Sequence, residues 1–218
     1  MRNGESIKAR TVARARNPHS FALTTLRGAL SVGAYRPGAP IVIQDEARRL
    51  AISPTPVREA LARLAGEGLV EDRHGEGYVA RSMDAGALAD LYALHELYVL
   101  AALARTLNAP WVQTAWPSSP GPAGPSSPAH MTHALFSMIV SRCGNGALWR
   151  AHERTSVQLA PARLAEAVLF ADHGIELALL KTALGQGDVA QKKASVRAYH
   201  QRRRIAVGAL AAHLNTPP

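Results

Sequence analysis

Residues 53–64 have the sequence Ser-Pro-Thr-Pro-Val-Arg-Glu-Ala-Leu-Ala-Arg-Leu. Ser53 is a residue type favoured at a helix N-cap, and Pro54 suits the first helical position because an N–H there would have no intrahelical partner. Three apolar side chains recur at the spacing of one helical face: Val57, Leu61 and Leu64. Gly66 follows and favours termination. The stretch therefore predicts an amphipathic helix that ends near residue 65.

The segments before this stretch predict three further elements. Residues 20–32 place apolar side chains on one helical face, and the Arg-Pro-Gly turn within 33–38 ends that helix. The β-branched run 41–43 predicts a short strand, and 45–50 predicts a short helix. A helix, a strand and a second helix are therefore expected ahead of the helix at 53–64.

The segments after it predict a hairpin. Residues 69–70 and 77–80 are expected to form short strands around a turn at 72–76. The predicted elements follow the order of a winged helix-turn-helix: helix, strand, helix, turn, helix and hairpin. The helix at 53–64 is then the recognition helix, because the major groove of DNA is about as wide as a helix. Residues 20–82 are therefore predicted to be a DNA-binding domain.

The chain carries a formal net charge of +9 over 218 residues. Residues 1–82 hold 13 Lys and Arg against 8 Asp and Glu, whereas residues 83–218 hold 12 against 8. Such an excess points to an anionic partner, of which nucleic acid is one. Residues 1–19 predict a basic flexible arm, and both a DNA contact and a solvated tail remain open for it.

Cysteine and hydropathy patterns bear on the compartment. Cys143 is the single cysteine, so no disulfide can form within the chain, which suits a reducing cytoplasm. No apolar run approaches the roughly 20 residues of a membrane span, and no apolar signal core follows the basic N-terminus. We therefore expect a soluble, cytoplasmic protein with no membrane partner.

Residues 83–214 predict an all-helical domain. Alanine and leucine dominate and aromatic residues make up 5% of the chain, which favours helices over sheets. Helical patterns cover 84–107, 131–142, 147–159, 162–184 and 189–214. A Pro- and Ser-rich loop at 108–130 interrupts them. The predicted fold class is therefore mainly α, an N-terminal winged helix-turn-helix plus a C-terminal bundle of four or five helices.

Two segments carry a resemblance to a known family. Residues 33–38 read Gly-Ala-Tyr-Arg-Pro-Gly, and residues 52–70 read Ile-Ser-Pro-Thr-Pro-Val-Arg-Glu-Ala-Leu-Ala-Arg-Leu-Ala-Gly-Glu-Gly-Leu-Val. This arrangement resembles the GntR family of bacterial transcriptional regulators, over about residues 22–82. The resemblance implies a double-stranded DNA operator as the partner and a homodimer on a pseudo-palindromic site. Pro54 stands where many members have an arginine, so base recognition is expected to shift to neighbouring side chains.

The resemblance also implies which residues contact the operator. Thr55 and Arg58 match positions that contact phosphate and base edges, and Gln44 matches a contact at the start of the preceding helix. Arg63 is either a phosphate contact or part of a solvated helix face. The complete predicted DNA-binding set is Gln44, Ser53, Thr55, Arg58, Arg63, Arg73, His74 and Gly75.

The C-terminal helices resemble the FadR-type effector domain, called FCD, of the same family. Cys-Gly-Asn at 143–145 and Ala-Leu-Gly-Gln-Gly-Asp at 183–188 match two of its turns. Many such domains bind a divalent metal through one aspartate and three histidines. Those positions fall here at Thr132, Phe136, Leu177 and either Tyr199 or His200, so at most one ligand survives. We therefore expect no metal on the family pattern and no other cofactor, although a different set of histidines stays open.

The predicted effector-binding residues are His95, His133, Asn145 and His200. The arginine that often lies near the family's site, on the first long helix, falls at His95. The arginines at 197 and 202–204 either hold an anionic effector, if they face inward, or form a solvated stretch, which we favour.

Two functions are consistent with these patterns. The first is a dimeric regulator whose operator binding responds to a small organic acid, the effector class implied by the resemblance. The second is a DNA-binding module with a degenerate C-terminal domain that acts constitutively or through protein partners. An enzyme is not expected, because the sequence has no Gly-rich phosphate loop and no catalytic triad in a recognisable context.

Overall fold

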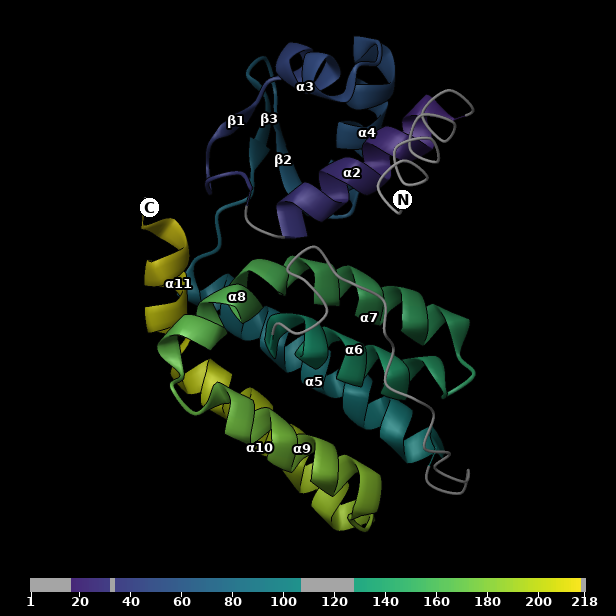
Figure 1. The fold of residues 1–218 in the computed structure, drawn as a ribbon, viewed down its shortest axis with the longest axis vertical. Coiled ribbons are helices and arrows are strands. Elements are labelled where there is room, and N and C mark those ends of the chain that lie inside the picture. Colours follow the sequence, from purple (N-terminus) through teal and green to yellow (C-terminus); the bar gives the residue numbers. More distant parts are fainter. Residues whose placement is uncertain (1–16, 32–33, 107–127, 217–218) are drawn as a thin grey trace, which may run out of the picture. The chain divides into compact units, whose positions relative to one another are not determined.

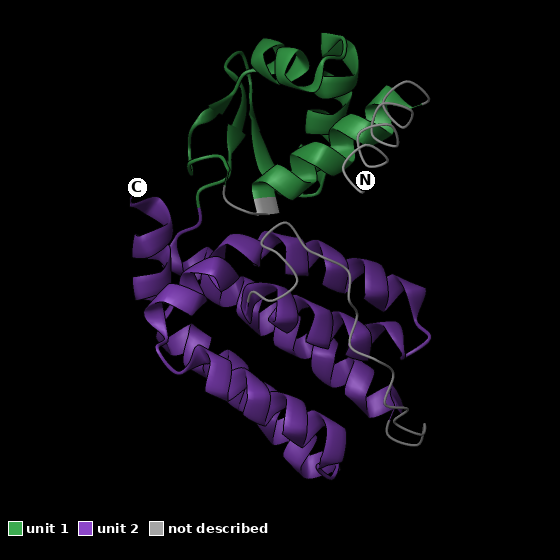
Figure 2. Ribbon diagram, viewed as in Figure 1, with its two compact units in different colours: residues 1–82 green, residues 83–218 purple. Residues whose placement is uncertain are grey.

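The computed structural model describes residues 17–31, 34–106 and 128–216. The basic arm up to residue 16 and most of the Pro- and Ser-rich loop lie outside the described residues. The chain divides into two compact units, residues 1–82 and 83–218 (Figure 1, Figure 2). Each unit is described by itself below.

The first unit contains three helices and a small antiparallel sheet. Its elements are α2 (Pro18–Ser31), β1 (Pro40–Ile41), α3 (Ile43–Leu50), α4 (Pro54–Gly66), β2 (Val70–Arg73) and β3 (Gly77–Ala80). The strand order is β1-β3-β2, and Val79 pairs with both Pro40 and Glu71. This arrangement confirms the predicted winged helix-turn-helix.

The core of the first unit lies between α2, α3, α4 and the sheet. Leu26 of α2 and the inner face of α4 are completely buried, and the latter consists of Val57, Ala60, Leu61 and Leu64. Two predicted boundaries were wrong. α2 begins at Pro18, inside the segment taken as the arm, and Ile43 begins α3 instead of ending a strand.

The second unit is a bundle of seven helices within the described residues. They are α5 (Ala85–Thr106), α6 (Pro128–Ser141), α7 (Gly146–Gln158), α8 (Ala160–Leu169), α9 (His173–Gln186), α10 (Val189–Ile205) and α11 (Val207–Asn215). This confirms an all-helical unit. The prediction that 128–130 belong to the loop was wrong, because Pro128 begins α6.

The expected number of helices, four or five, was also wrong. The chain leaves the helical conformation at Phe170, which has φ −106° and ψ 96°, and at Ala206, which has φ −93° and ψ 5°. The second break allows α11 to pack on α5 and α8, where Leu210 is completely buried. Tertiary packing therefore divides the predicted helical patterns 162–184 and 189–214 into two helices each, although neither Phe170 nor Ala206 is a Gly or a Pro.

Helix α5 lies at the centre of the second unit and contacts α6, α7, α10 and α11. Its 22 residues are long and apolar enough to meet the length and composition criteria for a membrane span, contrary to the expectation from the sequence. Core helices of soluble proteins meet the same criteria. Tyr92, Val99 and Leu103 of α5 are buried within the bundle, so we interpret α5 as the core helix of this unit.

Candidate nucleic-acid interface and interior polar cluster

Helix α4 presents its first turn to solvent. Ser53 is the N-cap residue, with an extended backbone, although its side chain makes no capping hydrogen bond to a described residue. Pro54 occupies the first turn, while Thr55 and Arg58 are exposed. The apolar face of α4 is fixed in the core, so its opposite face is held rigidly in contact with solvent. A partner that enters from solvent would meet Thr55 and Arg58 first.

Arg58 forms no hydrogen bond or ion pair with any described residue. The other predicted arginine contacts do have acidic partners: Arg63 lies 3.3 Å from Glu67, and Arg73 lies 3.4 Å from Glu71. Burial raises the pKa of Tyr78 in β3, and the charge of Arg58 opposes this rise. Within the described part of the chain, Arg58 is therefore an unpaired cation on α4.

The wing is the hairpin of β2 and β3. Arg73, His74 and Gly75 are all exposed at its tip. Gly75 and Gly77 have φ values of +80° and +86°, a backbone conformation that side chains with a Cβ disfavour. These two glycines therefore fix the shape of the turn that carries Arg73 and His74.

Helix α3 carries a polar contact that the sequence did not predict. Arg49 donates to Glu46 over 2.9 Å, and its guanidinium also approaches the hydroxyl of Tyr35 at 3.5 Å. Burial and the charge of Glu46 raise the pKa of Tyr35 to about 12, so the phenol stays protonated. Ala47 and Leu50 pack α3 into the core of the first unit, while Gln44 lies on the exposed side of the same helix.

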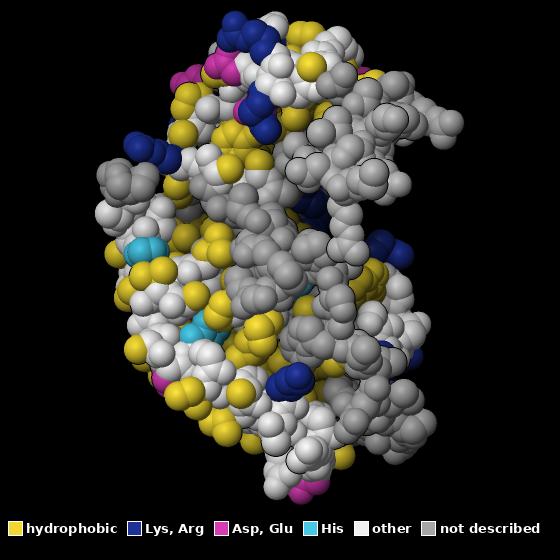
Figure 3. Space-filling model, in the orientation of Figure 1, with side chains coloured by type: hydrophobic (Ala, Val, Ile, Leu, Met, Phe, Trp, Pro, Cys, Tyr) yellow, Lys and Arg dark blue, Asp and Glu magenta, His cyan; other side chains and the backbone are white. Residues whose placement is uncertain are grey.

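Lys and Arg side chains are scattered over the face shown in Figure 3 instead of forming one patch. Charge density on that face therefore does not mark a nucleic-acid surface. The candidate interface is therefore defined by individual side chains of α3, α4 and the wing.

The interior of the second unit contains a chain of polar side chains that begins at Arg163 of α8. Its guanidinium donates to His95 Nε2 at 3.0 Å, and His95 Nδ1 lies 2.8 Å from His200 Nε2. His200 Nδ1 lies 2.7 Å from the carbonyl oxygen of Val196. Because the guanidinium can only donate, His95 Nε2 must accept. Both histidines are then neutral and carry their proton on Nδ1.

Arg163 also begins a second set of hydrogen bonds, which leads to Ser156 and His133. It donates to the carbonyl and hydroxyl oxygens of Ser156, and His133 Nδ1 lies 2.9 Å from the same hydroxyl. His152 is completely buried beside His95, with ring centroids 4.8 Å apart. Three of the four predicted effector residues thus gather around Arg163. Neither Arg163 nor His152 belongs to a recognised motif, so the sequence alone did not point to either residue.

The fourth predicted effector residue, Asn145, has a different place. It is the N-cap of α7, and its side-chain oxygen accepts hydrogen bonds from the backbone N–H groups of Ala147 and Leu148 at 3.1 and 3.0 Å. This contact satisfies two donors that a helix start leaves without a partner. The structure therefore does not bring Asn145 together with the histidines.

The histidines of this cluster have pKa values below the usual range. Burial lowers the pKa of His200 to about 3 and that of His133 to about 4, and the charge of Arg163 adds to both effects. The pKa values of His95 and His152 are also lowered, again chiefly by burial. These imidazoles are therefore neutral at physiological pH.

Acid should destabilise the second unit. Below about pH 6.5 the unfolded chain binds protons on these histidines while the folded unit does not, so the free energy of unfolding falls as pH falls from 7 toward 4. His200 alone should account for about 2 kcal/mol between pH 8 and pH 5. Urea unfolding followed by tryptophan fluorescence measures this unit alone, because no tryptophan lies in residues 1–82.

The matched variants for this measurement are His200→Gln and His74→Gln. The first should reduce the dependence of the urea midpoint on pH without abolishing it, because His95, His133 and His152 keep their lowered pKa values. The second removes an exposed histidine of the first unit and should leave the dependence unchanged. Equal midpoints at pH 8 and pH 5 for the natural chain would contradict the prediction.

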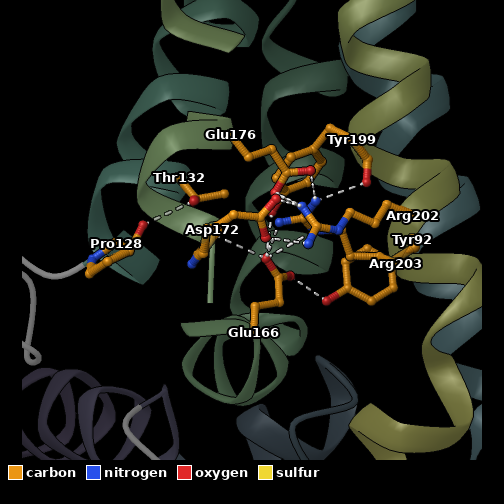
Figure 4. Close-up of polar contacts among 10 residues, drawn as sticks. Tyr92, Pro128, Thr132, Glu166, Asp172, Glu176, Tyr199, Arg202 and Arg203 are labelled. Atoms are coloured by element: carbon orange, nitrogen blue, oxygen red, sulfur yellow. Dashed lines mark hydrogen bonds and ion pairs between the residues drawn. The ribbon is translucent and has the colours of Figure 1, made fainter. Parts of the chain in front are cut away.

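A second buried cluster surrounds Arg203 of α10. Figure 4 shows its guanidinium between the carboxylates of Glu166 and Glu176, with contacts of 3.0 and 2.5 Å. The hydroxyls of Tyr92 and Tyr199 donate to Glu166 at 2.5 and 2.9 Å. Arg203 and Glu166 are both completely buried. These side chains form a buried network of ion pairs and hydrogen bonds that connects α5, α8, α9 and α10.

The favoured interpretation of the arginine stretch as solvated was therefore wrong for Arg203. Arg197 is exposed, so the interpretation as a solvated side chain is correct for that residue. Arg202 pairs with Asp172 at 2.5 Å, and Arg204 pairs with Glu96 at 3.2 Å, both as partly exposed pairs. One of three consecutive arginines faces inward because successive helical residues are rotated by about 100°.

The positions that hold a metal in the resembling domains do not fit a metal here. Thr132 donates its hydroxyl to the carbonyl oxygen of Pro128, and Tyr199 donates to Glu166 (Figure 4). Phe136 and Leu177 are buried apolar side chains. Among the described residues, no group of three or more His, Cys, Asp or Glu side chains is arranged to hold a metal ion.

Comparisons with known proteins support the winged helix-turn-helix assignment of the first unit. Residues 20–79 match the model of bacterial regulatory proteins of the gntR family. The chain is 43% identical over 60 residues to the Nta operon transcriptional regulator of Aminobacter aminovorans, which covers 28% of this chain and 29% of that protein. It is 42% identical over 59 residues to an HTH-type transcriptional regulator of Mycobacterium tuberculosis, which covers 27% and 24%. The match thus spans less than a third of each relative.

Solved structures resemble more of the chain. Escherichia coli McbR/YncC has a TM-score of 0.64 at 20% identity and covers 87% of this chain and 96% of its own. A GntR protein from Rhodococcus sp. RHA1 has a TM-score of 0.64 at 18% identity and covers 87% and 97%. At these identities the likeness concerns the fold alone. Residues 20–79 therefore form a winged helix-turn-helix of the gntR type, joined in one chain to an all-helical unit.

Proposed function

We propose that this chain is a DNA-binding transcriptional regulator that acts in the cytoplasm. The observation that carries the proposal is Arg58, an exposed guanidinium without a described partner in the first half of α4. A positive side chain near a helix N-terminus is unfavourably placed in the helix dipole. A guanine edge or a phosphate in the major groove would compensate for that placement.

The remaining contacts of the proposed interface follow from exposure. Thr55 and Ser53 flank the start of α4, Gln44 lies on the exposed side of α3, and His74 and Gly75 lie at the wing tip. Arg63 and Arg73 have acidic neighbours, so they would contact phosphate only by exchanging those partners. Base recognition would therefore depend mainly on Arg58, Thr55 and Gln44.

The second unit is proposed to be an FCD-type domain that forms the dimer and binds a small organic acid. Support comes from the histidines around Arg163, which place a positive charge and several polar nitrogens in the bundle interior. Two such chains would hold two copies of α4 on the half-sites of a pseudo-palindromic operator. The alternative is a DNA-binding module without a sensing role, which the loss of metal ligands at Thr132, Phe136, Leu177 and Tyr199 favours.

The test is Arg58→Ala. Selection from random duplexes with the natural chain first yields the operator, and fluorescence anisotropy then measures its affinity for each variant. We expect Arg58→Ala to weaken operator binding about 5- to 150-fold, corresponding to about 1–3 kcal/mol, and to relax the base preference at one position.

The matched control is Arg197→Ala, which removes the same charge from an exposed site in the second unit. It should change operator affinity far less than Arg58→Ala. An Arg58→Ala protein that binds the operator as tightly as the natural chain would show that α4 does not read DNA through this residue.

A further inference from the structure

One end of the second unit carries most of its excess positive charge. It is the end at which α5 and α6 terminate, α7 begins, and a turn joins α9 to α10 (Figure 1). The segments that reach this end, residues 99–106, 136–150 and 177–193, hold 6 Lys and Arg against 1 Asp or Glu. The remainder of 83–218 holds 6 against 7. The charge of this unit is therefore polarised along the bundle.

The six cations of this end lie around one apolar cluster. The cluster contains Leu103, Cys143, Leu180 and Val196, and Trp149 packs against it. Each cation stands within four residues of one of these side chains. Arg105 Nε also donates to the carbonyl oxygen of Cys143 at 3.4 Å, which joins the end of α5 to the turn before α7. The set, called the basic end below, is Arg105, Arg142, Arg150, Lys181, Lys192 and Lys193.

All six side chains reach solvent, three of them as exposed and three as partly exposed residues. Asp188 is the single acidic residue in the same segments. Its carboxylate serves as the N-cap of α10, where it accepts from the backbone N–H of Gln191 at 2.8 Å. Because the cations come from five helices and turns, they do not form one patch on the single face that Figure 3 shows. The basic end therefore presents a net positive charge that surrounds the end of the bundle.

Helix dipoles account for only part of this arrangement. A cation near the C-terminus of a helix is stabilised by the dipole, which explains Arg105 and Arg142 at the ends of α5 and α6. Arg150, Lys192 and Lys193 instead lie within the first five residues of α7 and α10, where the dipole does not favour a cation. The two lysines are also neighbours in the sequence, so their charges repel each other. An external polyanion would offset these placements.

We propose that the basic end binds the phosphate backbone of a second DNA duplex, so that one chain holds two duplexes. Lys and Arg contact phosphates without reading bases. The choice of DNA rests on the proposed function, because operator binding through α4 would keep neighbouring DNA at a high local concentration. An acidic protein or an anionic membrane lacks that supply. The basic end itself belongs to the second unit and is separate from the residues proposed to read the operator.

The test is whether the full-length chain binds a second duplex after its operator site has been filled. The chain is saturated with a short unlabelled operator duplex, and a labelled duplex of unrelated sequence is added at about 50 mM salt. Specific binding is about 10³–10⁷ tighter than non-specific binding, so the labelled duplex cannot displace the operator. The anisotropy of the label should rise with chain concentration, with a Kd below about 10⁻⁴ M.

The matched variants remove two charges from opposite ends of α10. Lys192→Gln/Lys193→Gln should weaken binding of the second duplex about 10- to 100-fold at about 50 mM salt, and it should lower the slope of log K against log salt by about 2. Arg202→Gln/Arg204→Gln should change both quantities far less, since these arginines lie at the other end of the helix and already pair with carboxylates. Operator affinity should stay the same in both variants.

Urea unfolding followed by tryptophan fluorescence verifies that the variants are folded. Should Lys192→Gln/Lys193→Gln fail to fold, Arg105→Gln/Lys181→Gln, on α5 and α9, takes its place with the same expected loss. The proposal is overturned by the absence of second-duplex binding at about 50 mM salt, by its retention in a folded variant of the basic end, or by equal losses in the two α10 variants.

Two further polyanions distinguish the class of partner. Polyglutamate and vesicles that contain phosphatidylserine replace the labelled duplex in parallel titrations at the same salt concentration. Binding that is tighter to either of them than to the duplex would assign the basic end to an acidic protein or a membrane surface, and would overturn DNA as the partner.

Failure of the basic end can be distinguished from failure of the proposed function. If selection yields no operator, a random duplex is titrated alone, and the difference between the two α10 variants still measures the basic end. A chain that binds its operator but no second duplex would overturn this inference and leave DNA recognition through Arg58 standing.

Discussion

Glu166→Gln should lower the free energy of unfolding of the second unit by about 3–5 kcal/mol. Glu166 is completely buried and accepts hydrogen bonds from Tyr92, Tyr199 and Arg203. Glutamine has almost the same volume, but it removes the negative charge and turns one acceptor into a donor. That donor would face other donors, and Arg203 would keep Glu176 as its one acidic partner among the described residues.

Urea unfolding followed by tryptophan fluorescence measures this loss in the unit concerned. The matched control is Asp172→Asn, which breaks the Arg202–Asp172 pair at the surface. Exposed pairs stabilise proteins little because water screens both charges, so this midpoint should hardly move. Equal shifts for Glu166→Gln and Asp172→Asn would show that burial of the Glu166–Arg203 pair has no special energetic role.

Leu61→Ala should destabilise the winged helix-turn-helix by about 2–5 kcal/mol. Leu61 is completely buried on the inner face of α4 and packs in the core with α2 and α3. Its loss leaves a cavity that the surrounding helices fill only in part. Because the same helix carries Arg58, we expect operator binding to disappear at temperatures where the natural chain still binds.

The control for this substitution is Glu59→Ala, which changes an exposed residue of the same helix. Its effect on stability should stay within about 0.5 kcal/mol. Circular dichroism detects the loss of the first unit in Leu61→Ala, while the tryptophan transition of the second unit should keep its midpoint. Retention of full operator affinity and stability by Leu61→Ala would contradict the assignment of Leu61 to the core.

The first unit was largely predictable because its signals are local. The N-cap position of Ser53, the proline at the first turn and the spacing of Val57, Leu61 and Leu64 all lie within one helix and agree with one another. The break at Ala206 was not predictable in this way. Residues on both sides favour helix, and the packing of Leu210 against other helices decides where the axis changes.

The candidate effector cluster was predictable only in part. His95, His133 and His200 were singled out as histidines on predicted helices of the second unit, and they do lie around one buried charge. Arg163 carries that charge, yet it stands in an ordinary helical pattern where an exposed arginine would look the same. Its importance depends on what surrounds it, and no spacing within α8 records that.

The sequence by itself determined the winged helix-turn-helix and the position of its recognition helix, because helix capping, periodicity and turn glycines act between residues close in the chain. The tertiary structure alone decided which charges are buried and whether each has a counter-charge. Arg203 meets Glu166 across 37 residues, whereas Arg163 meets only neutral groups among the described residues. Pairing of this kind depends on how the helices pack, and burial gives each charge its energetic weight.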